Sequence, residues 1–385
     1  MNTKSVRGTV RAASLGVVFS LAATAVGAAD HAGHAGHQPG HQSADHASVD
    51  HSKMDHSQHN GQRDELGRIG FDMKHTMDAA LMKELRQNIA LFEKYSDAEI
   101  ALSMDMRGPE YAWYISPPEV KAGQGVLVLM HGFREQGDKM FKKSIESIGN
   151  IFPTAMGVGM SMMMSSHIQA GIDELERAGA QQIVVVPVTS SATNELYRQW
   201  RYIFGAQEKA EYATVGRVKS KAKLLMAPPP GEDPLVAEIL IDHASEISTD
   251  PANEVVIIAG HGPSAVSDNE LELKVLAKLA QIVKEDGGFS AVHGQTLQDD
   301  APAPIRAANV QKMRGLVEAA KRDGKTVLVV TNLIGARTIQ AKLRDDLKGL
   351  DFKFNAKGIA QHPNFMKWMG EAVRKELADA KVARN

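Results

Sequence analysis

The feature that most constrains this chain is a segment that occurs twice, a short apolar run that ends in His-Gly. The run 126–130 leads into His131, the run 255–259 leads through one glycine into His261, and glycine follows each histidine. Apolar runs of this length without alternation are typical of parallel strands buried on both faces. A glycine just after the strand allows a sharp turn. The repeat therefore predicts two parallel sheets, each with an imidazole at the carboxyl end of a strand, where open α/β sheets bind their ligands.

The rest of each repeat matches as well. In the first repeat, a helical pattern over 168–177 is followed by a glycine turn and an apolar strand over 183–186. In the second, the corresponding helix and strand are expected over 310–322 and 326–330. Alternation of strand, helix and strand implies right-handed crossovers and parallel sheets. The fold class predicted is α/β, with two similar domains that each have a parallel sheet flanked by helices and that face a central cleft.

The N-terminal segment has the pattern of a bacterial secretory leader. Three basic residues precede an alanine-rich apolar stretch that ends in small residues at 27–29. No other run is long and apolar enough to span a bilayer, so we expect a periplasmic protein without a membrane span once the leader is cleaved. The expected segments are a signal peptide (1–29), a disordered His-rich tail (30–63), a helical arm that packs on the first domain (64–120), a first α/β domain (121–249) and a second α/β domain (250–385).

The composition argues against nucleic-acid binding and limits the side chains that could hold a metal ion. The formal net charge of −2 offers no basic excess for nucleic acid. Cysteine is absent, so disulfides play no part, and any metal must be held by His, carboxylate, Met or backbone oxygen. The composition does not indicate an oligomeric state.

The tail is dense in histidine, interleaved with Asp, Gly and Ser. Imidazoles at this density bind first-row transition metals, with Cu²⁺, Ni²⁺ and Zn²⁺ the expected ions. A solvated tail without a physiological metal is the alternative. The expected metal ligands of the tail are His31, His34, His37, His41, His46, His51, His56 and His59.

Over residues 124–385 the chain resembles the class II tetrapyrrole chelatases, the sirohydrochlorin cobaltochelatase and ferrochelatase group. The resemblance rests on the two His-Gly strands together with the duplicated glycine-to-strand segment that ends in Val186-Pro187. It implies chelatase-like domains and ATP-independent insertion of a divalent metal (Co²⁺, Fe²⁺ or Ni²⁺) into a sirohydrochlorin-like tetrapyrrole in the cleft. It also implies that His131 and His261 bind the metal and accept the pyrrole protons. The further histidine that many members carry after the later strand is missing from both halves.

Arg134 and Glu135, which follow the first histidine, are further candidates for the binding site. Glu135 lies in a segment expected to be a polar loop, where its carboxylate would help to neutralise the charge of the metal. Arg134 is expected to anchor substrate carboxylates, because a guanidinium donates two parallel hydrogen bonds. The alternative for each strand-end histidine is a structural role, with its ring nitrogens bonded to backbone.

Methionine is concentrated between residues 156 and 164, just before His167. Met160 and Met163 are predicted to line the binding site of a flat macrocycle, since thioether side chains are apolar and adaptable. A buried helix face would show the same spacing, and ligation of a soft ion such as Cu⁺ is a third alternative. His243, in a helix expected over 235–247, is predicted to be solvated.

Two other functions compete with chelation. A periplasmic protein that binds or delivers metal without turnover is favoured by the leader and by the missing histidines. An α/β-hydrolase requires a G-x-S-x-G turn after a strand. The nearest sequence, residues 159–163, lacks the closing glycine, and no strand is expected before it. The sequence therefore favours a chelatase, with metal delivery as the alternative.

Overall fold

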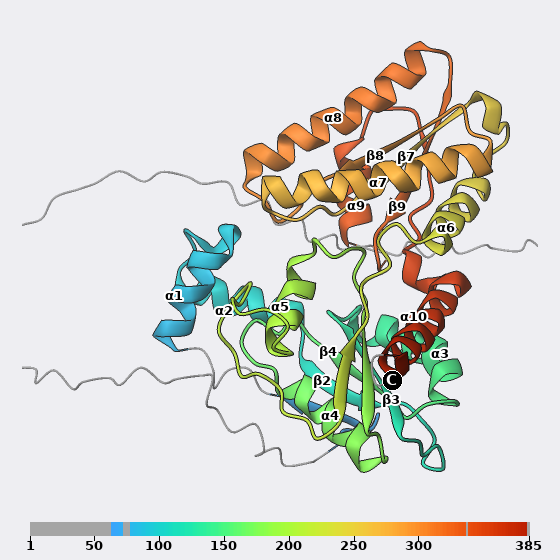
Figure 1. The fold of residues 1–385 in the computed structure, drawn as a ribbon. Helices are drawn as coiled ribbons and strands as arrows, with labels where there is room; N and C mark the ends of the chain where they lie inside the picture. The colour runs from blue at the N-terminus through green and yellow to red at the C-terminus, as the bar shows by residue number, and fades with distance from the viewer. Residues whose placement is uncertain (1–62, 72–77, 336–337, 383–385) are drawn as a thin grey trace, which may run out of the picture. The chain divides into compact units, whose positions relative to one another are not determined.

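The computed structural model describes residues 63–71, 78–335 and 338–382. The predicted leader and the eight tail histidines lie outside these residues. Within them, the chain forms two α/β lobes (Figure 1), which belong to one compact unit. The first lobe comprises residues 63–71, 78–226 and 363–382, and the second comprises residues 234–361. The α/β class with parallel sheets flanked by helices is confirmed.

The first lobe is built on a six-stranded sheet with the order β1-β2-β4-β3-β5-β6. Strands β4, β3, β5 and β6 are parallel, and β2 is antiparallel to β4. The central strand β3 is buried from its second residue to its last, as its unbroken apolar run predicts. The strands are β1 (Arg68–Phe71), β2 (Glu110–Tyr114), β3 (Gln124–Met130), β4 (Thr154–Val158), β5 (Gln182–Pro187) and β6 (Lys223–Met226), and the helices that follow are α3 (Arg134–Gly149), α4 (Ser166–Arg177) and α5 (Glu195–Ile203).

The segment expected as a packing arm is partly built into this sheet. Its helices are α1 (Ala79–Asn88), a 3₁₀ turn (Ala90–Phe92) and α2 (Asp97–Arg107), and α2 begins with a capping box in which Ser96 and Glu99 bond each other's backbone. The flanking strands β1 and β2 extend the sheet on the side of β4. The arm therefore contributes two strands to the first sheet as well as helices packed on the lobe.

The second lobe has a four-stranded, all-parallel sheet with the order β10-β9-β7-β8. Its central strand β7 is buried throughout. The strands are β7 (Glu254–Gly260), β8 (Ala291–Thr296), β9 (Thr326–Asn332) and β10 (Lys353–Phe354), and the helices are α6 (Pro234–Ser245), α7 (Val266–Gly287), α8 (Ala303–Arg322) and α9 (Thr338–Asp346).

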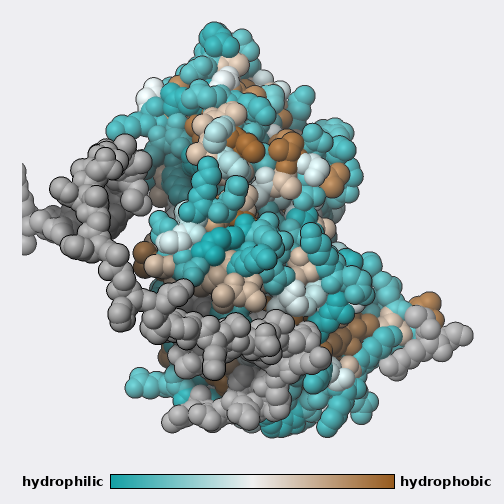
Figure 2. All heavy atoms as spheres, turned by 90° about the vertical axis from the view of Figure 1, so that its left-hand side faces the viewer, coloured by the Kyte–Doolittle hydropathy of each residue, from teal (hydrophilic) through white to brown (hydrophobic). Residues whose placement is uncertain are grey.

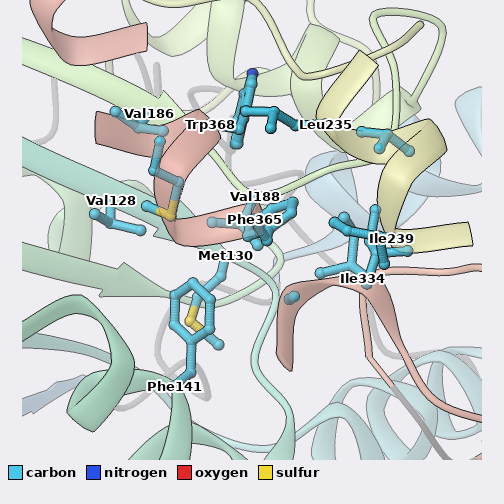
Figure 3. Packing of buried hydrophobic residues seen from close by; sticks show 14 of the residues in the cluster. Val128, Met130, Phe141, Val186, Val188, Leu235, Ile239, Ile334, Phe365 and Trp368 are labelled. Atoms are coloured by element: carbon cyan, nitrogen blue, oxygen red, sulfur yellow. The ribbon is translucent and has the colours of Figure 1, made fainter. Parts of the chain in front are cut away.

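Helix α10 (Pro363–Val382) returns the chain to the first lobe. It packs against β5, β6 and α3 as well as α6 (Figure 1). Phe365 and Trp368 lie beside Val186 and Val188 of the first lobe and near Leu235 of α6 (Figure 3). One hydrophobic core consequently runs through both lobes. The sequence predicts the boundary between the domains at residue 249, and nothing in it indicates that the C-terminal helix packs on the first lobe.

The surface carries few large apolar side chains. On the face drawn in Figure 2, the described residues are mostly hydrophilic and the apolar ones form small separate patches. No helix in the described part of the chain has the length and hydropathy that crossing a bilayer requires.

Candidate functional site

His131 lies at the carboxyl end of β3, the strand at the centre of the parallel part of the first sheet. The chain turns immediately after it, because Gly132 adopts a left-handed φ of 97°, which a side chain would strain. The next residue is held by α3, where the carboxylate of Asp138 accepts the backbone N–H of Phe133 at 2.5 Å. The imidazole of His131 packs edge-to-face on the Phe133 ring, with 5.3 Å between centroids. This turn presents the imidazole at the edge of the sheet.

The surroundings of His131 favour the neutral ring. The side chain reaches solvent, but protein atoms lie close around it, and this desolvation is the main cause that lowers its pKa. The positive charges of His261 and Arg107 lower the pKa further. A neutral imidazole has a free lone pair and can ligate a metal ion.

His261 occupies the corresponding place in the second lobe, just after the central strand β7. Its Nδ1 lies 2.9 Å from the carbonyl oxygen of Gly262, and its Nε2 lies 3.5 Å from Oδ2 of Asp300. A carbonyl oxygen only accepts hydrogen bonds, so Nδ1 carries the proton and Nε2 is left with the lone pair. The ring is therefore oriented with its basic nitrogen toward a carboxylate.

The charge around His261 has the opposite effect to that around His131. Burial alone would lower the pKa of His261, but the negative charges of Asp300, Asp299 and Glu195 outweigh burial and raise it. The charge of His261 also contributes to lowering the pKa of His131. The two predicted histidines thus differ, with one ring favoured as neutral and the other as a proton acceptor.

Contacts between the lobes hold these two sheet edges together. Glu195, the first residue of α5, accepts the backbone N–H of Ser264 at 2.6 Å from the loop after β7. Arg198, one turn further along α5, pairs with Asp268 of α7 at 2.8 Å. A third contact joins Thr193 to Glu272, at 2.6 Å between Oγ1 and Oε2. These bonds fix the carboxyl ends of the two sheets beside each other.

A small cavity lies next to His131 on the side of the first lobe. Its volume is about 10 Å³, enough for one water molecule. Met160 and Met163, both predicted to line a binding site, border it. The complete lining is Met104, Arg107, Gly108, Glu110, His131, Gly159, Met160, Met162 and Met163.

The methionine segment has a different structure from the helix face that was one alternative. Met156 lies within strand β4, and residues 160–164 form the loop between β4 and α4. The expectation that no strand precedes Gly159 is therefore wrong. The β4 sequence TAMGV has only two β-branched residues, and it carries Gly157 because a Cβ there would lie 2.9 Å from a methyl carbon of Leu129.

A buried polar chain supports this loop. Oγ of Ser161 lies 3.2 Å from Nε2 of His167, whose Nδ1 lies 2.9 Å from a carboxylate oxygen of Glu110. The order of atoms is that of a Ser-His-acid triad. Ser161, however, is completely buried, and its Oγ also accepts the indole N–H of Trp200 at 3.2 Å. This arrangement leaves no room for a substrate carbonyl, so the chain of bonds is structural.

Arg134 and Glu135 are not in a loop, and that expectation is wrong. They form the first turn of α3, a helix whose buried face carries Phe141, Ile145 and Ile148. Arg134 is exposed and has a left-handed φ of 62°. The Glu135 carboxylate pairs with Lys139 one turn later, at 2.6 Å, and this hydrogen bond lowers its pKa. Their roles toward substrate and metal stay predictions.

Sequence reasoning missed two charged residues of this region. Asp300 comes shortly after β8, so the rule that ligand-binding residues follow parallel strands could have found it. Arg107, the last residue of α2, had no such signal. Its side chain borders the cavity beside His131, its guanidinium lies over the Phe92 ring, and its Nε is buried without a hydrogen-bond partner among the described residues.

The described residues contain no group of three or more His, Asp or Glu side chains placed to hold a metal ion. His131 and His261, the predicted metal ligands, are therefore not part of a preformed cluster of metal-binding side chains among these residues.

Comparison with solved structures gives the class of fold. SirB from Bacillus subtilis, solved with Fe³⁺, superposes with a TM-score of 0.51 at 18% identity, over 68% of this chain and 98% of SirB. The sirohydrochlorin chelatase SirB from Bacillus subtilis subspecies spizizenii, solved in complex with cobalt, gives 0.46 at 15% identity, over 66% and 95%. No protein-family model and no curated protein matches the sequence. The chain thus has an α/β fold similar to that of SirB.

Proposed function

We propose that this protein inserts a divalent metal ion, Co²⁺ or Fe²⁺, into a sirohydrochlorin-like tetrapyrrole without ATP. The reaction takes place where the carboxyl ends of the two sheets meet. The observation that carries the proposal is that His131 and His261 each follow the central strand of a sheet, that the carboxyl ends of these sheets are held together, and that the two rings lie in opposite electrostatic surroundings. Two neighbouring groups whose pKa values are displaced in opposite directions are typical of paired catalytic roles.

The proposal assigns a different role to each imidazole. His131, favoured as neutral, donates a lone pair to the incoming metal. His261 accepts a pyrrole proton at Nε2, because its Nδ1 proton is committed to the Gly262 carbonyl. Asp300 then stabilises the imidazolium ion that forms. Each turnover exchanges two pyrrole N–H protons for one divalent cation; His261 takes one of these protons and the second passes to solvent water.

Arg107 suits the periphery of such a substrate. Sirohydrochlorin-like macrocycles carry carboxylate side chains, and a guanidinium whose Nε has no hydrogen-bond partner among the described residues can bind one of them with two parallel hydrogen bonds. Its place beside His131 would orient the ring over the metal ligand. Arg134, exposed one residue beyond Phe133, is proposed as a second anchor.

The proposal also includes a role for the His-rich tail, in the compartment that the leader predicts. We infer that the eight tail histidines collect metal ions in the periplasm, with Cu²⁺, Ni²⁺ or Zn²⁺ as competing ions. SirB, whose fold is similar, was solved with Fe³⁺, and this supports iron as one of the metals that the present protein handles.

The test is metal insertion by the full chain without its leader, under anaerobic conditions, with sirohydrochlorin and Co²⁺ or Fe²⁺. The visible spectrum reports conversion. We expect His261→Ala to lower the rate on the order of 100-fold, the lower end of the range for a general base. We expect His131→Ala to raise the metal concentration that gives the half-maximal rate, because it removes a metal ligand. His293→Ala is the matched control, since His293 is exposed on the neighbouring strand β8.

Conversion no faster than without protein would refute the proposal. In that event, retention of metal by the chain would support the alternative, a protein that binds or delivers metal without turnover.

A further inference from the structure

The cavity beside His131 has a selective lining. All of its apolar side chains are methionines: Met104, Met160, Met162 and Met163. The hydrophobic cluster to which Met104, Met162 and Met163 belong also contains Leu81, Met82, Leu85, Phe92 and Ile100, and Met160 packs against it. The cavity is thus bordered by methionines of this cluster together with His131.

The backbone that carries two of these methionines is unusual. Ser161 has a left-handed φ of 52°, and Gly159, at a φ of 151°, lies so close to Glu110 that a Cβ would come within 2.5 Å of the carboxylate side chain. A left-handed backbone is strained for serine and persists only where other contacts impose it, whereas glycine adopts a positive φ without strain. Here the contacts of Ser161 with Glu110 and His167 impose it. The fold therefore maintains a strained turn that holds Met160 and Met162 at the cavity.

The donor set defines which ion would fit. Thioether sulfur is a soft ligand that selects Cu⁺ over hard divalent ions, and a neutral imidazole also suits copper. Four thioethers and one imidazole contribute no negative charge. A volume near that of one water molecule is also the size of one bare ion.

Two charged residues, Glu110 and Arg107, also border the cavity, and Glu110 is paired with His167. Attraction to Glu110 and repulsion from Arg107 both scale with the charge of the ion, so these two residues do not select that charge. The preference for a soft ion comes from the thioether donors.

We propose that Met104, Met160, Met162, Met163 and His131 form a binding site for a soft monovalent metal ion, Cu⁺. This site adjoins that of the proposed chelation reaction: it shares His131 with it, and Met160 and Met163 are also the residues predicted to line the macrocycle site. It does not depend on that reaction, because its test measures binding and not turnover.

The test uses the full chain without its leader, labelled with ¹³C at the methionine methyl groups, and Ag⁺ as a monovalent soft ion that is not readily oxidised. Ag⁺ is added as nitrate in chloride-free buffer, and the methyl resonances are followed by NMR. Single Met→Leu variants assign the four cavity signals. Met106, exposed on the same helix as Met104, is the matched control, and Met54 reports separately on the tail.

We expect the four cavity resonances to shift together and to stop shifting at a common Ag⁺ concentration, while Met106 stays in place. Binding to tail histidines consumes Ag⁺ but does not change these signals. A competition titration of Cu⁺ against a chromophoric chelator should then show one fewer tightly bound Cu⁺ in Met160→Leu/Met163→Leu than in Met106→Leu.

Cavity resonances that do not move in excess Ag⁺ would overturn the proposal, as would equal Cu⁺ stoichiometry in the double variant and its control. If the double variant does not fold, His131→Ala takes its place, since His131 reaches solvent and is not part of the core.

Discussion

His243 makes the stability of this protein depend on pH in a way that can be measured. Its side chain, on α6, is 2% exposed, and its Nδ1 is buried without a hydrogen-bond partner among the described residues. The ring of His362 lies edge-to-face at 5.8 Å between centroids. Burial, aided by the charge of His362, lowers the pKa of His243 from 6.5 to about 4. The folded protein therefore resists protonation at a site where the unfolded chain accepts a proton.

The sign and size of the effect follow from linkage. Between pH 6.5 and 4 the unfolded chain binds more protons at this residue, so the free energy of unfolding falls as the pH falls. At 1.36 kcal/mol per pKa unit, the loss between pH 7 and pH 5 is about 2 kcal/mol. Below pH 4 the effect is complete, because both states are then protonated.

The assay is chemical denaturation of the unmodified protein and of His243→Leu at a series of pH values. The difference in unfolding free energy between the two proteins cancels the titrating groups that do not interact with His243. Asp242, Glu246 and Lys357 do act on His243, so the difference reports His243 together with its coupling to them. We expect the unmodified protein to lose about 2 kcal/mol relative to the variant on going from pH 7 to pH 5. Parallel stability curves would refute the reasoning.

Three further predictions concern the site and the core. Asp300→Asn should lower the pKa of His261, because it removes the nearest negative charge; NMR titration of the ring protons checks this against Asp345→Asn, an exposed carboxylate on α9. Phe365→Ala should cost about 3–5 kcal/mol, the usual range for a large aromatic residue in a core, since Phe365 is fully buried where α10 meets both lobes, and the denaturation midpoint reports it. Gly262→Ala should destabilise the protein by about 1–2 kcal/mol from its left-handed backbone alone, and its Cβ would also lie 2.7 Å from Asn269. Gly315→Ala, in open space on α8, should instead stabilise the protein by about 0.5–1 kcal/mol. An unchanged melting temperature for Gly262→Ala would contradict this account.

The strands around the two histidines could be predicted because their signal is local. The apolar runs at 126–130 and 255–259 are long, unbroken and followed by glycine, and β3 and β7 appear where they indicate. The helices over 168–177 and 310–322 were predicted for the same reason.

Other features depend on contacts between distant residues and have no local signal. His243 was expected to be solvated, and that prediction is wrong, because the chain near residues 355–362 covers it. Strand β4 is weak in β-propensity and exists because β2 and β3 pair with it on either side. Arg107 borders the cavity because the helical arm (64–120) packs on the first lobe, and no local pattern in the sequence indicates this contact.

The return of α10 to the first lobe sets an order for folding. The core face of the first sheet is covered by residues that leave the ribosome more than a hundred positions after its last strand has been made. A nascent first lobe therefore leaves Val186, Val188 and their neighbours without this part of their packing until α10 is made. A chain that stops before α10 lacks the helix that packs on β5, β6 and α3 of the first lobe and on α6 of the second.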